Sequence, residues 1–232
     1  MYISLSLMKK MKFLKSLLLV SLTIFSLSCS KGTDPIPVDM GYDYYPLTIG
    51  NTWVYDVQEI DKNTLADDTT QYQLKEVVAE LVDGGDEDNY LLYRYKRASV
   101  SDTWVIDSVW SAKKETHYLI KTENNIRFQK LVFGVALGLS WDGNLWNVFE
   151  EETYTIVNLD IPYELNSIAY DEVLEVEQKV DKNLILSVDS REHYARGVGL
   201  IEVYKENLET QPGEKTLGMI YHQTLSSYLI VD

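Results

Sequence analysis

The sequence predicts an all-β fold, a curved antiparallel sheet that forms a partly open barrel or a sandwich, with few short helices. Three observations favour this fold class. Runs of alternating apolar and polar residues recur about every dozen residues, and turn-forming Gly, Asn and Asp separate them. The chain also holds 17 Tyr and 5 Trp, residue types that strands favour. Apolar residues make up 45% of the chain, enough for one packed core.

The first residues predict an export signal. Four lysines precede an apolar run over residues 17–27, which is the order of a basic and an apolar region in a signal peptide. Those eleven residues fall short of the roughly 20 that a membrane-spanning helix needs. We therefore predict a signal peptide over residues 1–28, and a start at Met8 or Met11 would give it a more usual length.

The apolar run ends at Ser26-Leu27-Ser28-Cys29, and Cys29 is the only cysteine of the chain. This stretch resembles the lipobox of bacterial lipoproteins, in which the cysteine at the cleavage point is acylated. Ser28 fits the small residue before the cysteine, whereas Ser26 stands where the family usually has Leu. The resemblance implies a lipid on Cys29 and a cell-envelope location, at the outer membrane, facing the periplasm or the cell surface. An ordinary secreted protein is the alternative.

Charge narrows the classes of partner. The chain carries 21 Lys and Arg against 36 Asp and Glu, a net charge of −15. Removal of residues 1–28 takes away four lysines and no acid, which leaves 17 bases and a net charge of −19. Such a surface repels nucleic-acid phosphates and anionic lipid head groups. We therefore expect no nucleic-acid partner, and attachment to the membrane through the lipid of Cys29.

The mature chain divides into two parts. Residues 29–41 hold two prolines and no periodicity, and predict a flexible tether. Residues 42–232 predict a single β-rich globular domain. Its first strand follows the turn at Gly50-Asn51, and Trp53, Tyr55 and Val57 alternate there with polar residues. We expect this aromatic face to be buried.

Later runs show a similar alternation, with the polar residues opposite the apolar ones. The apolar members are Leu91, Tyr93 and Tyr95 opposite Arg94 and Lys96; Trp104, Ile106 and Trp110 opposite Asp107; Tyr118 and Ile120 opposite Lys121; Tyr154 and Ile156; and Leu174, Val176 and Val180. Residues 198–205 and 217–231 complete the predicted strands.

Residues 72–82 fit two structures. Leu74, Val77, Val78 and Leu81 have the spacing of an amphipathic helix. A strand is favoured, because the turn after residue 82 leads directly into the next strand, and a bulge near Glu76 would reconcile the alternation.

Three segments resemble uncharacterised envelope lipoproteins of Gram-negative bacteria. They are Tyr44-Tyr45-Pro46-Leu47-Thr48-Ile49-Gly50-Asn51-Thr52-Trp53-Val54-Tyr55, Leu137-Gly138-Leu139-Ser140-Trp141-Asp142-Gly143 and Tyr194-Ala195-Arg196-Gly197-Val198-Gly199-Leu200. The first two also share an aliphatic-Gly-x-hydroxyl-Trp pattern, in which the glycine allows a turn and the tryptophan covers an end of the core. The resemblance implies no activity, cofactor or catalytic residue.

Candidate metal ligands are few. His117, His193 and His222 lie far apart in the sequence, and none belongs to a ligand motif. Residues with side-chain oxygens crowd one turn at Asp83, Asp86, Asp88 and Asn89, but they lack the spacing of a calcium loop. We therefore predict no metal site and no cofactor.

Candidate catalytic groups are equally weak. Glu150, Glu151 and Glu152 are adjacent, and adjacent strand residues point to opposite faces, so a charged edge is favoured over a glycosidase pair. Gly197-Val198-Gly199 lacks the remainder of a phosphate loop and predicts a turn or bulge. The chain contains no Gly-x-Ser-x-Gly motif.

The aromatic residues are the strongest functional signal. Trp104, Trp110, Trp141 and Trp146 with many tyrosines could form a stacking surface for sugars or a cavity for apolar ligands, although alternating aromatics are more often core. We expect a non-catalytic module that binds a small molecule, a glycan or an envelope protein. A hydrolase of envelope glycans or polymers is the alternative, and it requires two acids converging in a cleft.

Overall fold

A computed structural model describes residues 38–82 and 89–231. The predicted signal peptide, Cys29 and the acidic turn at Asp83, Asp86 and Asp88 lie outside these residues, and so does all but the end of the predicted tether. No helix among the described residues has the length and apolar character needed to cross a membrane.

Within the described residues the chain forms twelve strands and one 3-10 helix, η2 (Tyr42–Tyr44). The strands are β1 (Thr52–Lys62), β2 (Asp68–Val82), β3 (Asn89–Arg97), β4 (Val105–Lys114), β5 (Tyr118–Glu123), β6 (Ile126–Val132), β7 (Ser140–Asp142), β8 (Thr153–Leu165), β9 (Ile168–Lys182), β10 (Leu186–Ala195), β11 (Gly199–Glu209) and β12 (Leu217–Leu229). The all-β prediction is confirmed.

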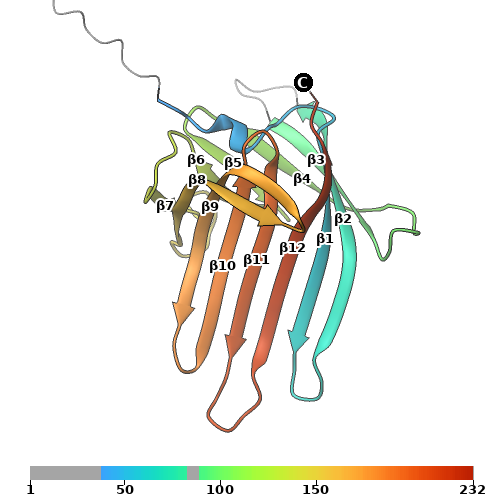
Figure 1. Ribbon diagram of the computed structural model, residues 1–232, viewed down its shortest axis with the longest axis vertical. Helices are drawn as coiled ribbons and strands as arrows, with labels where there is room; N and C mark the ends of the chain where they lie inside the picture. The colour runs from blue at the N-terminus through green and yellow to red at the C-terminus, as the bar shows by residue number, and fades with distance from the viewer. Residues whose placement is uncertain (1–37, 83–88, 232) are drawn as a thin grey trace, which may run out of the picture. The chain divides into compact units, whose positions relative to one another are not determined.

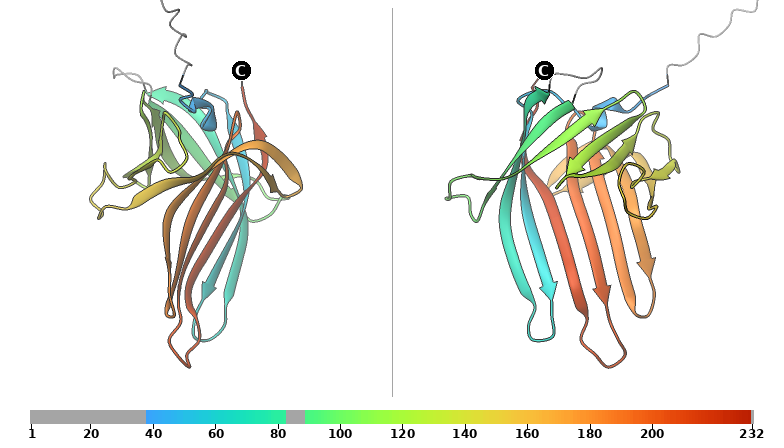
Figure 2. Two further views of the ribbon diagram at one scale, coloured as in Figure 1. Left: turned by 60° about the vertical axis from the view of Figure 1, so that its left-hand side comes forward. Right: turned by 180° about the vertical axis from the view of Figure 1, so that it is seen from behind.

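All twelve strands belong to one antiparallel sheet in the order β6-β5-β4-β3-β2-β1-β12-β11-β10-β9-β8-β7. Strand β1 pairs with both β2 and β12, which joins the first and the last strand in one continuous sheet. This sheet curves into a nearly closed barrel (Figure 2). Figure 1 shows the long strands β9 to β12, β1 and β2 side by side, and Figure 2 shows β3 to β6 crossing only their upper part. The lower half of the long strands is therefore left uncovered on the concave side.

One seam remains, between the edge strands β6 and β7. The Gln129 N–H donates to Gly143 O at 2.9 Å, and Trp141 Nε1–H donates to Gln129 O at 2.8 Å. The Asn147 amide donates to Arg127 O at 2.8 Å. The loop after β7 thus satisfies part of the exposed edge of β6, as unpaired strand edges require.

The N-terminal segment closes the upper end of the barrel. Tyr44 and Tyr45 are buried, and the Tyr45 ring lies 6.4 Å from Trp53 and 6.5 Å from Tyr194. Beneath them lies a layer of fully buried aliphatic residues that face inward: Val78, Leu92, Leu119, Leu131, Ile156 and Leu174. This layer is the apolar core, and it occupies only one end of the barrel.

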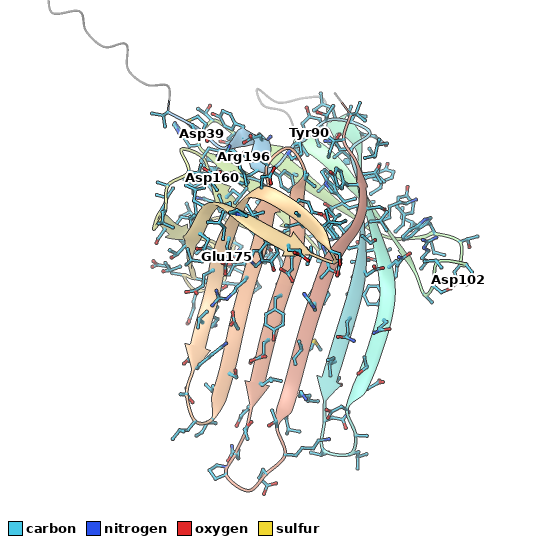
Figure 3. The ribbon with its side chains drawn as sticks, in the orientation of Figure 1. Asp39, Tyr90, Asp102, Asp160, Glu175 and Arg196 are labelled. Atoms are coloured by element: carbon cyan, nitrogen blue, oxygen red, sulfur yellow. The ribbon has the colours of Figure 1, made fainter. Side chains whose placement is uncertain are left out.

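Arg196 fixes this closing segment in place (Figure 3). Its guanidinium donates to Asp39 at 2.6 Å, Asp43 at 2.8 Å and Asp160 at 2.8 Å. The guanidinium also lies over the Tyr44 ring. Since a planar guanidinium offers five donors, one residue can join the N-terminal segment to β8. Contacts to the sheet thus begin at Asp39, ahead of the boundary that composition predicts.

The end of the β8–β9 hairpin folds over the outer face of β10 to β12 (Figure 1). Tyr163 of β8 stacks on His193 of β10 at a centroid distance of 4.5 Å, and its hydroxyl donates to Glu202 of β11. Bulges in the β8–β9 pairing allow this bend, because a bulge bends the strand that carries it.

The first strand and the ambiguous segment agree with the sequence analysis. Trp53, Tyr55 and Val57 are buried, and residues 72–82 lie within strand β2. The predicted bulge near Glu76 is misplaced, because the register shifts between Val78 and Glu80 instead.

The alternation is reversed in β3 and β5. Leu92 and Arg94 of β3 are buried, as are Leu119 and Lys121 of β5, whereas Tyr93 is only half-buried. The expectation that the charged members face solvent is therefore wrong for these strands. The reason is that the barrel interior below the apolar layer holds ion pairs, so charge is not a marker of the outer face there.

Candidate functional site

The barrel interior below the apolar core is a cavity of about 720 Å³. Inward-facing residues of β1 to β6 and β8 to β12 line it, and aromatic rings dominate its apolar surface: Tyr55, Tyr72, Trp110, Phe128, Tyr154 and Tyr221. A volume of this size is typical of small-molecule sites, which range over about 300–1,000 Å³.

One wall of the cavity holds a carboxylate shared by two bases. Lys121 Nζ of β5 lies 2.9 Å and 3.0 Å from the two oxygens of Glu76 on β2. Arg94 Nε of β3 lies 3.3 Å from Glu76 Oε2. All three residues are at most 9% exposed, so this cluster carries a buried net charge of +1.

The Trp110 ring covers the cationic side of this cluster. Its centroid lies 3.5 Å from Arg94 Cζ and 5.1 Å from Lys121 Nζ. Aromatic faces attract cations, so the indole stabilises both charges beside the cavity. Trp110 also donates its Nε1–H to Asn124, which fixes the plane of the ring.

The opposite wall holds a second buried ion pair. Lys130 of β6 donates to Glu192 of β10, with Glu123 at 3.8 Å, and the Tyr194 hydroxyl donates to the other oxygen of Glu192 at 2.5 Å. Burial pushes the pKa of Glu192 upward, but the positive charge of Lys130 outweighs it, so the pKa lies below its ordinary value. Glu192 is therefore an ionised carboxylate.

Below these pairs a row of polar side chains crosses the concave face, starting at β9. Gln178 Oε1 of β9 accepts a hydrogen bond from the Ser190 hydroxyl of β10 at 3.1 Å. Ser190 is paired in register with Lys205 of β11, and Lys205 with Tyr221 of β12. Paired residues of antiparallel strands point to the same face, so all four side chains face the cavity.

The row continues on the other wall. Tyr221 is paired with Glu59 of β1, and the Tyr72 hydroxyl of β2 donates to Glu59 at 2.6 Å. Lys96 of β3 lies with its ammonium 3.4 Å from the centroid of the Tyr72 ring. We call the set of Gln178, Ser190, Lys205, Tyr221, Tyr72 and Lys96 the transverse row.

Comparisons with known proteins are sparse. No protein-family model and no curated protein matches the sequence. Two crystal structures are similar. One is of a candidate lipoprotein from Parabacteroides distasonis, with 11% identity over 84% of this chain and 100% of that one and a TM-score of 0.43. The other is of a candidate exported protein with a YmcC-like fold from Bacteroides fragilis, with 9% identity over 83% of this chain and 100% of that one and a TM-score of 0.44.

The structure brings two of the sequence-distant histidines together, outside the cavity. His222 Nε2 lies 2.6 Å from Glu202 Oε1, and His193 Nδ1 lies 3.2 Å from Glu202 Oε2. Burial lowers the pKa of His193 despite the nearby carboxylates. Across residues 38–82 and 89–231, no group of three or more His, Cys, Asp or Glu side chains is arranged to hold a metal ion.

The other candidate residues are dispersed. Glu152 lines the cavity and pairs with Lys179 at 3.4 Å, whereas Glu150 and Glu151 are exposed. Gly197 and Gly199 flank the β10–β11 turn with φ of 68° and 102°, as the turn prediction expects.

The four tryptophans that the sequence analysis considered for a binding surface have separate roles. Trp110 lines the cavity, and the indole N–H groups of Trp141 and Trp146 donate to Gln129 at the seam. The Trp104 ring lies beneath Arg97 at 4.2 Å and Lys75 at 4.9 Å. Only one tryptophan therefore belongs to the candidate binding surface.

Sequence reasoning missed the buried charges that shape the cavity: Glu76, Arg94, Lys121, Lys130 and Glu192. A signal was present for some of them, because a charged residue two positions from a buried apolar one shares its face. Glu76 follows Leu74 and precedes Val78 in this way, and Lys121 follows Leu119.

Proposed function

We propose that the protein is a non-catalytic ligand-binding module of the cell envelope, held to the membrane by a lipid on Cys29. The outer membrane is the proposed location, with the domain facing the periplasm or the cell surface. The observation that carries the binding function is the open cavity of about 720 Å³ with aromatic walls. A filled, closed barrel would have removed this proposal.

Binding is favoured over hydrolysis by the state of the acids in the cavity. Glu76, Glu123 and Glu192 do face a common space, which a pair of catalytic carboxylates would require. However, Glu76 and Glu192 are each neutralised by buried bases, and the pKa of Glu192 is lowered. A glycosidase acid needs a raised pKa, which the charge of Lys130 opposes at Glu192.

Binding of the neutral fluorescent probe N-phenyl-1-naphthylamine tests the proposal. Val203 of β11 is 6% exposed and lines the cavity, so Val203→Trp should fill it and reduce probe affinity at least tenfold. Met219→Trp, at the 53% exposed Met219 of the cavity wall, is the second variant if Val203→Trp does not fold.

Val109→Trp is the matched control, because Val109 is 50% exposed and absent from the cavity lining. It should leave the probe affinity unchanged. Absence of probe binding by the wild-type protein would refute the proposed function, and so would equal binding by a folded cavity variant.

A further inference from the structure

The cavity presents hydrogen-bond donors that have no acceptor. Gln178 is 4% exposed, and its Nε2 has no hydrogen-bond partner among the described residues. The same holds, within that part of the chain, for Arg94 Nε, whose 3.3 Å approach to Glu76 lacks hydrogen-bond geometry. Both side chains line the cavity. An unmatched buried donor costs about 1–3 kcal/mol, so these atoms would gain from an acceptor brought by a ligand.

Two lysines of the transverse row add to this excess of donors. Lys205 and Lys96 line the cavity, and no ion pair joins either of them to a carboxylate within residues 38–82 and 89–231. Lys205 is exposed, and its charge contributes to the lowered pKa of Glu192. The ammonium of Lys96 rests on the Tyr72 ring instead. A protein with 36 acids and 21 bases thus leaves two bases of this cavity without an ion-pair partner among the described residues.

The carboxylates of the cavity are already engaged. The contacts are Glu76 with Arg94 and Lys121, Glu123 and Glu192 with Lys130, Glu152 with Lys179, Glu206 with Ser187 and Tyr204, and Asp107 with Ser108. Six acids and five bases line the cavity, and each of the six acids has a partner, whereas Gln178 Nε2 has no acceptor and Lys205 and Lys96 form no ion pair among the described residues. The cavity surface therefore has unpaired hydrogen-bond donors and lacks acceptors for them.

We propose that the cavity binds an amphiphile with one acidic head group, a carboxylate or a phosphate ester. Lys205 and Gln178 hold the head from one wall and Lys96 from the other, while the apolar body lies along Tyr55, Trp110 and Phe128. This inference rests on the proposed ligand-binding function and specifies its ligand class.

The chemistry of the head follows from the donors. An ionised carboxylate or phosphate has acceptors and few or no donors, so it satisfies amide and ammonium groups together. Charge-assisted hydrogen bonds of this kind are about twice as strong as neutral ones. The protein's net charge of −15 repels free anions, so affinity must come from local contacts and from the apolar body.

Displacement of bound N-phenyl-1-naphthylamine separates head-group chemistry from apolar binding. Palmitate, palmitoyl lysophosphatidate, hexadecanol and hexadecyltrimethylammonium share a sixteen-carbon chain and are compared below their micelle concentrations. We expect at least one of the two anions to bind tenfold or more tightly than hexadecanol, and the cation to bind most weakly. Preference for palmitate identifies a free fatty acid, and preference for lysophosphatidate identifies a phospholipid-type head.

Lys205→Met should lower affinity for the preferred anion about tenfold and leave hexadecanol affinity unchanged. Lys215→Met is the matched control, because Lys215 pairs with Asp67 and does not line the cavity. If hexadecanol binds as tightly as both anions, or Lys205→Met affects all ligands alike, the acidic-head inference is wrong while probe binding still supports the cavity function. If the probe itself does not bind, the proposed function fails as well.

Discussion

Glu76→Gln should be the most damaging single conservative change in the barrel. The substitution keeps the shape of the side chain but removes the negative charge that Lys121 and Arg94 share at 2.9 Å and 3.3 Å. Breaking a buried ion pair costs about 3–5 kcal/mol, because the remaining charge is left uncompensated. Here two buried cations lose one partner, so we expect the free energy of unfolding to fall by about 5 kcal/mol. At about 2–4 °C per kcal/mol for a domain of this size, Tm should drop by about 10–20 °C.

Thermal and urea unfolding followed by circular dichroism measure this loss. Lys121→Met in the Glu76→Gln background removes one of the two stranded cations and should recover part of the stability. Asp67→Asn is the surface control, because it breaks contacts to Lys62 and Lys215 that are well exposed, and it should leave Tm unchanged. A Tm of Glu76→Gln within about 2 °C of the wild type would refute the reasoning that the cluster is desolvated.

Three further outcomes are expected. The free energy of unfolding should decrease as the pH falls below about 6.5, because His193 protonates in the unfolded chain whereas burial lowers its pKa in the folded protein. It should decrease more steeply below about 4.5, because the pKa of Glu192 is also lower in the folded protein. A flat pH profile in urea titrations would contradict this prediction. Gly218→Ala should destabilise by several kcal/mol, because φ is 129° and the added Cβ would lie 2.0 Å from Asn207 O, whereas Gly213→Ala, with no atom within 4 Å, should destabilise less. The intact mass of the membrane-extracted protein should match residues 29–232 plus acyl chains. The variant Cys29→Ser should lose both the acyl mass and the membrane attachment. An unacylated wild-type protein would contradict the lipid anchor.

The fold class was accessible from the sequence because strand periodicity is local. The alternation of Trp53, Tyr55 and Val57 with polar residues predicts the buried face of the strand, and the glycine turn before it predicts where the strand begins. Even the helix-like spacing of residues 72–82 was resolved by the neighbouring turn and strand. The lipid anchor on Cys29, the signal peptide and the tether stay predictions, since all of them except residues 38–41 of the tether lie outside the described residues.

The candidate site was not accessible in the same way. Glu76, Lys121 and Arg94 belong to three different strands. Lys130 and Glu192 belong to two further strands and lie 62 positions apart in the sequence. Whether a charged residue faces solvent or a partner depends on the side of the sheet that closes, and alternation alone does not state which side that is. This is why the alternation predicts the wrong inward face for β3 and β5.

The sequence by itself determined an acidic, all-β chain with a single cysteine and aromatic strands that bury one face, and it predicts an export signal. Only the tertiary structure decided that the apolar core fills one end of the barrel and that ion pairs line the rest. The physical reason is that a buried charge is tolerated only beside its partner, and the partners are brought together by strand order and register. The unmatched donors Gln178 Nε2 and Arg94 Nε become visible only in the folded barrel, where the partners of the neighbouring charges are known.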